Sequence, residues 1–164
     1  MAGDGSATGE DVVTVNPEGL APPGGHYSHV ASANGFVFVS GQLPITPQGV
    51  KLVEAPFEAQ AEQVLKNVEA ALVGAGSSVE QLVQVRVYLD SIDNWPAFNA
   101  VYAKWLGLAR PARAIVPTGP LHFGLRVEVE AVAIARSTVA TTAGSPPARS
   151  RPSGRHPSPR NRTA

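Results

Sequence analysis

Apolar positions early in the chain predict two strands joined by a tight turn. The pattern of residues 27–31 and 36–40 is typical of extended segments. They are joined by Ser32-Ala33-Asn34-Gly35, whose Asn-Gly pair suits the positive φ angles of a two-residue hairpin turn. The sequence therefore predicts a β-hairpin over residues 27–40.

A segment of helical periodicity follows, and then an alternating one. Over residues 56–74 apolar side chains recur every three or four positions, and Gly74 and Gly76 end the pattern. Residues 82–89 alternate instead, with valines on one face and Gln84, Arg86 and Tyr88 on the other. These patterns predict a long amphipathic helix and a half-buried strand.

An aromatic stripe marks a second helix. Asp93 or Asn94 suits its cap, and Pro96 suits its first turn. The side chains at helical spacing are Trp95, Phe98, Val101, Tyr102 and Trp105. We interpret them as core and not as a platform for stacking bases, because they share one face of the helix.

Two further strands complete the predicted fold. Residues 112–116 and 125–135 have the pattern of strands and flank a turn at Pro117-Thr118-Gly119-Pro120. The order of elements is then β-β-α-β-α-β-β. This order predicts the α+β class, with one sheet and two helices packed on one face of it.

The length of 164 residues suits one domain with two loose ends. We expect a flexible N-terminal segment at residues 1–15, a folded domain at 16–137 and a disordered tail at 138–164. Val12, Val13 and Val15 leave open a short edge strand within the first segment. The tail is rich in Pro, Ser and Arg, a composition that cannot repay its ordering entropy. It is either an electrostatic tether or a dispensable terminus.

Composition and charge exclude several classes of protein. Cysteine is absent, which removes disulfides, thiol nucleophiles and thiolate metal sites. Neither a membrane span nor a signal peptide is recognisable, so we expect a cytoplasmic protein with no membrane partner. Residues 1–140 hold eight basic and thirteen acidic residues, a net charge of −5, and the other five basic residues lie in the tail. An acidic body argues against nucleic-acid binding except through that tail.

Motifs for nucleotide and metal chemistry are missing from the sequence. It has no phosphate-binding glycine loop and no His-Glu-x-x-His. His26 and His29 are three positions apart on an expected strand, which puts them on opposite faces and argues against a shared metal. We expect both imidazoles at the rim or the surface.

Charged residues inside apolar strands are the candidates for chemistry. Arg113 lies in such a strand, where a guanidinium on a rigid backbone matches a substrate carboxylate. Glu128 lies in Arg126-Val127-Glu128-Val129-Glu130, where charges alternate with valines. Burying an unpaired ion is costly, so these positions signal a ligand or a partner. For the second segment, a solvated sheet face with cross-strand ion pairs is the alternative.

Five segments, in this order, resemble the RidA (YjgF/YER057c/UK114) family. They are Gly25-His26-Tyr27-Ser28, Val39-Ser40-Gly41-Gln42-Leu43-Pro44, Asn99-Ala100-Val101-Tyr102, Arg110-Pro111-Ala112-Arg113 and Val127-Glu128-Val129-Glu130-Ala131. Each segment alone is weakly specific, but their order with helices between them is specific over residues 16–136.

The resemblance implies a chorismate-mutase-like fold that assembles as a homotrimer with clefts between subunits. It also implies hydrolytic deamination of 2-imino or 2-enamino acids, such as 2-aminoacrylate or iminopyruvate, to 2-oxo acids and ammonia without a cofactor. By the same match, Arg113 holds the substrate carboxylate and Glu128 orients or activates the water. The implied lining residues are Tyr27, Gly41, Asn99 and Ile115.

This chain departs from the family's pattern at three places. His26 stands where many relatives have proline, and Ile115 stands where many have cysteine. The segment from Thr118 to Gly124 also differs, and His122 and Phe123 within it are expected to give the cleft a bulkier, more aromatic wall. The expected substrate is accordingly larger or more apolar.

Three other functions stay open. A regulatory trimer would bind a carboxylate metabolite at the same arginine without turning it over, and a tight complex with a 2-oxo acid would favour it. An RNA-directed activity, described for some relatives, would depend on residues 141–164. An imine hydrolase dedicated to one biosynthetic or catabolic pathway would carry out the same reaction on a single intermediate of that pathway.

Overall fold

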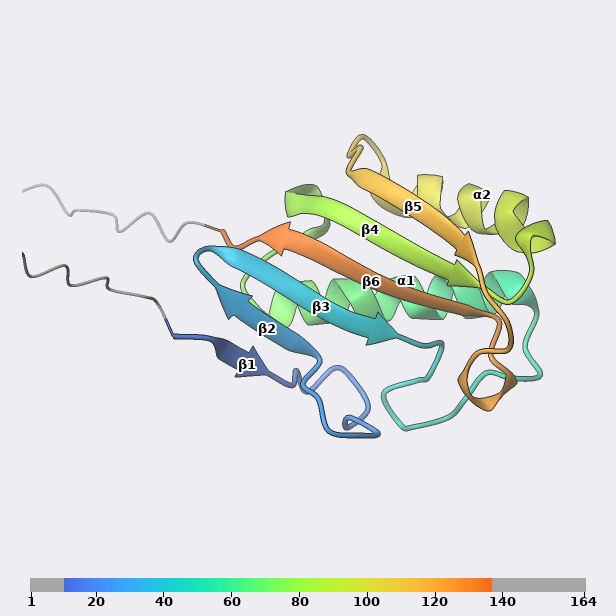
Figure 1. The fold of residues 1–164 in the computed structure, drawn as a ribbon, viewed down its shortest axis with the longest axis horizontal. Coiled ribbons are helices and arrows are strands. Elements are labelled where there is room, and N and C mark those ends of the chain that lie inside the picture. The colour runs from blue at the N-terminus through green and yellow to red at the C-terminus, as the bar shows by residue number, and fades with distance from the viewer. Residues whose placement is uncertain (1–10, 137–164) are drawn as a thin grey trace, which may run out of the picture.

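One six-stranded sheet with two helices on one face makes up the computed structural model, which describes residues 11–136 (Figure 1). The strand order is β1-β2-β3-β6-β4-β5. The elements are β1 (Val13–Val15), β2 (Val30–Ala33), β3 (Phe36–Gln42), α1 (Phe57–Gly74), β4 (Leu82–Leu89), α2 (Trp95–Leu106), β5 (Ala112–Pro117) and β6 (Val127–Ile134). This architecture confirms the α+β class. The expectations for residues 1–10 and for the tail lie outside the described residues.

Local signals account for the first half of the sheet. β2 and β3 pair antiparallel, and Asn34 and Gly35 turn the chain between them with φ angles of 50° and 77°. The predicted hairpin is confirmed, although its first strand begins at Val30. β1 pairs with β2, so the sheet gains an edge strand from residues that we assigned to the flexible segment. β-branched side chains favour that extended backbone, and β2 offers it a free edge.

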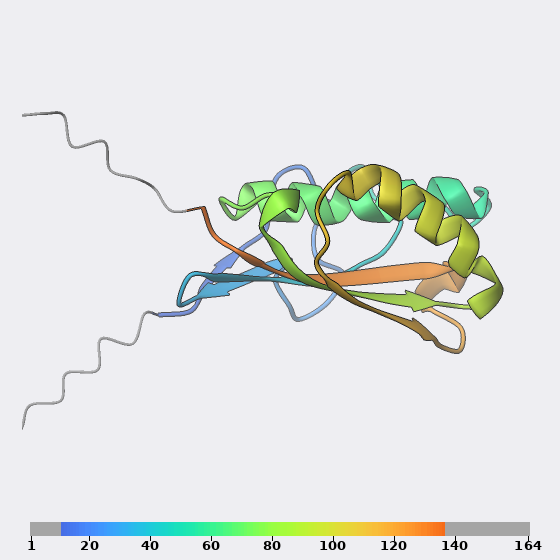
Figure 2. The same ribbon diagram turned by 90° about the horizontal axis from the view of Figure 1, so that it is seen from above.

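A crossover builds the second half of the sheet. β6 lies between β3 and β4 and runs antiparallel to both, whereas β5 runs parallel to β4. Parallel neighbours need a long connection, and α2 supplies it. Both helices cover the same face of the sheet, and the other face carries no helix (Figure 2).

Alternation along the strands sorts the side chains between these two faces. Buried residues on the helix-covered face are Val37, Val39, Val85, Val87, Leu89, Val127, Val129, Ala131 and Ala133. On the bare face Phe36, Phe38 and Ile134 are 43%, 46% and 46% exposed. A half-exposed apolar sheet face of this kind is typical of a surface that another chain covers.

Asn94 lies at the N-cap of α2 and Pro96 lies in its first turn, as predicted. A 3-10 turn at Ile92–Asn94 precedes the helix, and no side chain caps α2 itself. The Asn94 side chain is used elsewhere, since its amide donates to Asp90 and its oxygen accepts from Arg126. The aromatic stripe is confirmed as core at Phe98 and Tyr102, which are buried, while Trp95 is exposed.

Candidate functional site

An open cavity of about 910 Å³ lies where three loops meet the end of β3 and the start of β6. Five of the predicted site residues line it, and they come from four separate parts of the chain: Tyr27, Gly41, His122, Phe123 and Glu128. Other lining residues include Leu20, His29, Ser40, Leu43, Ile45, Lys51 and Glu130. The cavity therefore joins a carboxylate wall to an aromatic and aliphatic one.

The carboxylate wall depends on a close approach between β3 and β6. The ladder of these strands shifts register between Val39 and Gln42, so Gly41 lies in a bulge. A Cβ atom placed on Gly41 would collide with the Oε1 atom of Glu128 and would lie 3.1 Å from its Cδ. Only glycine at this position leaves room for the Glu128 carboxyl group.

The environment of Glu128 favours its protonated form. Burial raises the pKa of this carboxyl group above the ordinary value of 4.5, with a smaller upward contribution from the Glu130 carboxylate. The electrostatic interaction with His122 opposes both and lowers the pKa of Glu128. A carboxylate with a raised pKa is a stronger base than an exposed one, which suits proton transfer from water.

Tyr27 reaches the cavity from the loop before β2. Its hydroxyl accepts a hydrogen bond from Gly24 N at 3.3 Å, and its ring meets the His29 ring edge-on, with centroids 5.8 Å apart. The phenol is 47% exposed, so it remains available to a ligand.

His29 is buried, so its expected position at the rim is wrong. Its Nε2 lies 2.8 Å from Ala21 O and its Nδ1 lies 3.2 Å from Gln42 Nε2. Because the carbonyl needs a donor, Nε2 carries the proton and Nδ1 accepts from the amide of Gln42. The residue is also outside β2, where its backbone N donates to Asn16 Oδ1 at 2.9 Å. His29 thereby ties the Tyr27 loop to β3.

Nothing among the described residues forms a metal site. Within residues 11–136 no group of three or more His, Asp or Glu side chains is placed to hold a metal ion. The expectation that a strand puts His26 and His29 on opposite faces is wrong in its premise, because both residues precede β2 and neither lies in a strand.

The aromatic wall is a tight turn that carries His122 and Phe123. Phe123 has a φ angle of 62°, a left-handed conformation that costs a bulky residue about 1–2 kcal/mol. The Lys51 Nζ lies 4.2 Å from the centre of its ring, and the His122 ring lies 6.0 Å away. Sequence reasoning missed Lys51, because a single lysine in a loop carries no periodic or motif signal.

The remaining predicted residues form a second cluster at the β5 edge. Arg113 Nη1 donates to Asn99 Oδ1 at 3.0 Å, and the guanidinium lies 4.8 Å from the centre of the Tyr102 ring. Within the described chain no carboxylate lies within 4.0 Å of Arg113. Ile115 follows two positions later and packs partly against the core. None of Asn99, Arg113 and Ile115 lines the cavity.

The ring of Tyr102 packs against the Arg113 guanidinium. Its side chain is 4% exposed and its hydroxyl has no hydrogen-bond partner among the described residues. Burial raises the pKa of this phenol, although the nearby Arg113 opposes the rise. The ring stays neutral and presents its π face to the cation, a favourable contact for a guanidinium.

The register of β4 places the two clusters on opposite faces of the sheet. Val85, buried beneath the helices, pairs with Arg113, whereas Tyr88 pairs with Glu128. Residues three positions apart on a strand point to opposite faces. Within one chain the guanidinium and the carboxylate therefore face away from each other. The sheet therefore lies between the Arg113 cluster and the Glu128 cluster.

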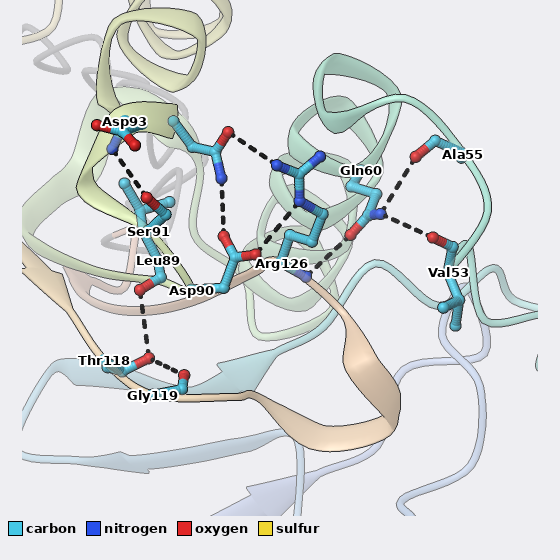
Figure 3. A network of polar contacts seen from close by, with 11 residues as sticks. Val53, Ala55, Gln60, Leu89, Asp90, Ser91, Asp93, Thr118, Gly119 and Arg126 are labelled. Atoms are coloured by element: carbon cyan, nitrogen blue, oxygen red, sulfur yellow. Dashed lines mark hydrogen bonds and ion pairs between the residues drawn. The ribbon is translucent and has the colours of Figure 1, made fainter.

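A polar network behind the cavity links both helices to β6 (Figure 3). Arg126 Nε lies 3.3 Å from Asp90 Oδ2, and its Nη2 donates to Asn94 Oδ1 at 3.1 Å. The Arg126 backbone N donates to Gln60 Oε1 at 3.0 Å, which explains why β6 begins at Val127 and not at the predicted residue 125. The network holds the base of the turn that carries Phe123.

Comparisons with known proteins identify relatives of this chain. The family model described as Endoribonuclease L-PSP matches residues 19–135. Protein HMF1 of Saccharomyces cerevisiae is 38% identical over 128 residues, which cover 76% of this chain and 98% of that protein. The crystal structure of RidA from an Antarctic Psychrobacter matches with a TM-score of 0.71 and 31% identity, covering 74% of this chain and 98% of that one.

A third comparison includes a ligand. The crystal structure of E. coli TdcF with bound serine matches with a TM-score of 0.70 and 27% identity, covering 76% of this chain and 99% of that one. No helix within residues 11–136 is both long and apolar enough to span a membrane. By its matching family model and its relatives, the chain belongs to the YjgF/RidA family.

Proposed function

We propose that this protein hydrolyses 2-imino or 2-enamino acids to 2-oxo acids and ammonia, in clefts between the subunits of a homotrimer. The observation that carries the proposal is the separation of Arg113 from Glu128 on opposite faces of one sheet. In this proposal each cluster is half of a site: one offers the Arg113 guanidinium, which has no carboxylate within 4.0 Å among residues 11–136, and the other offers the Glu128 carboxylate in an open cavity. Two copies that place these halves together complete it.

The chemistry follows from the two charges. Arg113 of a neighbouring copy binds the substrate carboxylate through paired donors, which leaves the imine carbon near Glu128. Glu128 takes a proton from water as the oxygen attacks the carbon of the N-protonated imine, the C=N electron pair moves onto nitrogen, and a tetrahedral carbinolamine forms. Glu128 then gives this proton to the nitrogen and takes the hydroxyl proton as the C–N bond breaks and the carbonyl forms, which releases ammonia and the 2-oxo acid. No cofactor takes part in this sequence.

The remaining lining groups support these steps. Tyr27 offers its hydroxyl to the ligand, and Asn99 holds Arg113 through the 3.0 Å hydrogen bond. A positioned water and a positioned carboxylate are what an already electrophilic imine carbon needs.

Imine decay in the presence of the protein tests the proposal. Imino acids are generated in situ with an amino-acid oxidase, and their decay is followed with the wild type, Arg113→Ala, Glu128→Gln and Arg136→Ala. We expect acceleration by the wild type, a loss of about 10²-fold or more in kcat/KM for the first two variants, and none for Arg136→Ala, whose side chain lies at the far end of β6. Equal rates for the wild type and Glu128→Gln would remove the carboxylate from the mechanism.

A binding protein for a carboxylate metabolite is the second candidate, favoured by the serine in the related TdcF structure. It predicts that a 2-oxo acid binds wild type but not Arg113→Ala, and that no imine decays faster. An RNA-directed activity is less well supported, because residues 1–140 carry a net charge of −5. The cytoplasmic location and a role for the basic tail stay predictions.

A further inference from the structure

The aromatic wall of the cavity is held in place from two sides. Leu125 N donates to His122 O at 3.1 Å, which makes Phe123 and Gly124 the central pair of a tight turn, with φ angles of 62° and 77°. Phenylalanine is strained in this conformation and glycine is not. Strain that persists in a ligand cavity points to a side chain whose direction matters.

Lys51 fixes the ring from the opposite loop. Its Nζ lies 4.2 Å above the Phe123 ring, and its backbone forms an isolated bridge with Ile45. Within residues 11–136 no carboxylate lies within 4.0 Å of this ammonium group. The aromatic ring is thus its defined partner, and this contact joins two loops from distant parts of the sequence.

The position of this wall identifies the part of a substrate that meets it. The reacting carbon lies at Glu128 and Gly41, and the carboxylate goes to Arg113 of a neighbouring copy. The substituent left over is the side chain of the imino acid. The rest of the lining includes polar groups such as Lys51 and His122, and its apolar and aromatic part is formed by Phe123, Leu43 and Ile45.

We propose that Phe123, held by Lys51, is the specificity-determining residue of the cavity and selects 2-imino acids with bulky aromatic or branched aliphatic side chains. This inference rests on the proposed function for the position of the reacting carbon. Burial of a large apolar side chain against the ring stabilises the complex, whereas a methyl group leaves the wall unfilled. Lys51 acts as a positioning residue, since it touches the ring.

Binding of two stable 2-oxo acids tests this without any turnover. Phenylpyruvate and pyruvate are titrated calorimetrically into the full chain as wild type, Phe123→Gly, Lys51→Met, Lys51→Arg and Lys66→Met. We expect the wild type to bind phenylpyruvate at least about tenfold more tightly than pyruvate. Phe123→Gly relieves the backbone strain and should remove this preference, so that phenylpyruvate binds no more tightly than pyruvate.

The lysine variants separate positioning from general charge. Lys51→Met should lose part of the preference and Lys51→Arg should keep it, because arginine also stacks on aromatic rings. Lys66 lies on the exposed face of α1 and does not line the cavity, so Lys66→Met should behave as wild type.

The outcomes are distinguishable from those of the imine assay. A preference that survives in Phe123→Gly, or a wild type that binds neither oxo acid or prefers pyruvate, overturns the inference. A wild type that prefers phenylpyruvate through Phe123 but hydrolyses no imine overturns only the proposed function.

Discussion

Gly41 and Glu128 show how single residues make the cavity. Glu128 occupies the space that any side chain at Gly41 would fill, and burial in that space raises its pKa. The backbone at Gly41 does not need glycine for its φ angle, because its φ lies outside the left-handed region. The need for glycine is therefore steric, and it concerns the carboxyl group alone.

Gly41→Ala should displace the Glu128 carboxyl group and leave the fold intact. Since a misplacement of about 1 Å can cost 10²-fold in rate, we expect kcat/KM for imine hydrolysis to fall by about 10–100-fold. Gly119→Ala is the matched control, because a Cβ there has no atom within 4 Å. Unchanged activity in Gly41→Ala, with an unchanged circular dichroism spectrum, would contradict the steric account.

The raised pKa of Glu128 also predicts that the stability of the folded chain depends on pH. Because the pKa of Glu128 is raised in the folded chain, the folded chain binds the carboxyl proton more tightly than the unfolded chain does. Its favourable contribution is present below the ordinary pKa of 4.5 and is lost as pH rises through the raised value. Glu128→Gln should therefore melt at a higher temperature than the wild type at pH 7, with the advantage shrinking toward pH 4.

Thermal denaturation across this pH range measures the effect. A variant less stable than the wild type at pH 7 would mean that the ionised carboxylate has a stabilising partner. Arg113 of a neighbouring copy is the candidate for that partner.

At the scale of elements, the site depends on how helices are attached to the sheet. α2 supplies Asn99 and Tyr102 to Arg113 on β5, and Phe123 lies in the turn that leads into β6. Gln60 of α1 anchors this turn: it is fully buried, accepts from Arg126 N, and donates to Val53 O and Ala55 O at 3.4 and 3.2 Å (Figure 3). One amide thus satisfies three backbone groups.

Gln60→Leu should be strongly destabilising. It leaves buried backbone groups without partners, for which we expect a loss of about 2–4 kcal/mol in the free energy of unfolding. Urea denaturation at a fixed protein concentration measures this loss. Glu62→Leu, on the exposed face of the same helix, should change stability by no more than about 0.5 kcal/mol. Similar losses in both variants would show that the network is not the cause.

At the scale of the whole molecule, the chain presents two separate polar clusters, around Glu128 and around Arg113, and one bare sheet face. Phe36 and Phe38 lie on that face with ring centroids 6.3 Å apart, and both are nearly half exposed. Burial of these rings against other copies would stabilise an assembly, and a closed threefold arrangement repeats one interface three times. The proposed trimer accounts for both the exposed rings and the separated charges.

Phe38→Glu should break the assembly, because it puts a charge on the apolar face. Light scattering should give three times 17.0 kDa for the wild type and 17.0 kDa for the variant, which should also lose activity. Val73→Glu changes a residue that is 62% exposed on α1, away from this face, and should remain trimeric. A trimeric Phe38→Glu would exclude the bare face as the interface.

The sequence by itself determined the elements and the types of chemistry. Apolar periods of two and of 3.6 residues mark strands and helices, and Asn34-Gly35 alone specifies the hairpin turn. β4 has the predicted bounds, and α1 begins one residue later than predicted and ends at the predicted residue. Arg113 and Glu128 also stand out in the sequence, because each places a charge within the apolar pattern of a strand.

Only the tertiary structure decided where those residues meet. Strand pairing puts Arg113 and Glu128 on opposite faces, and loop packing buries His29 and brings Lys51 to Phe123. A periodic pattern shows that a face is buried, but it does not show what covers that face. Contacts between segments distant in sequence are made by loops, which have no period, so they can be identified only once the chain has folded.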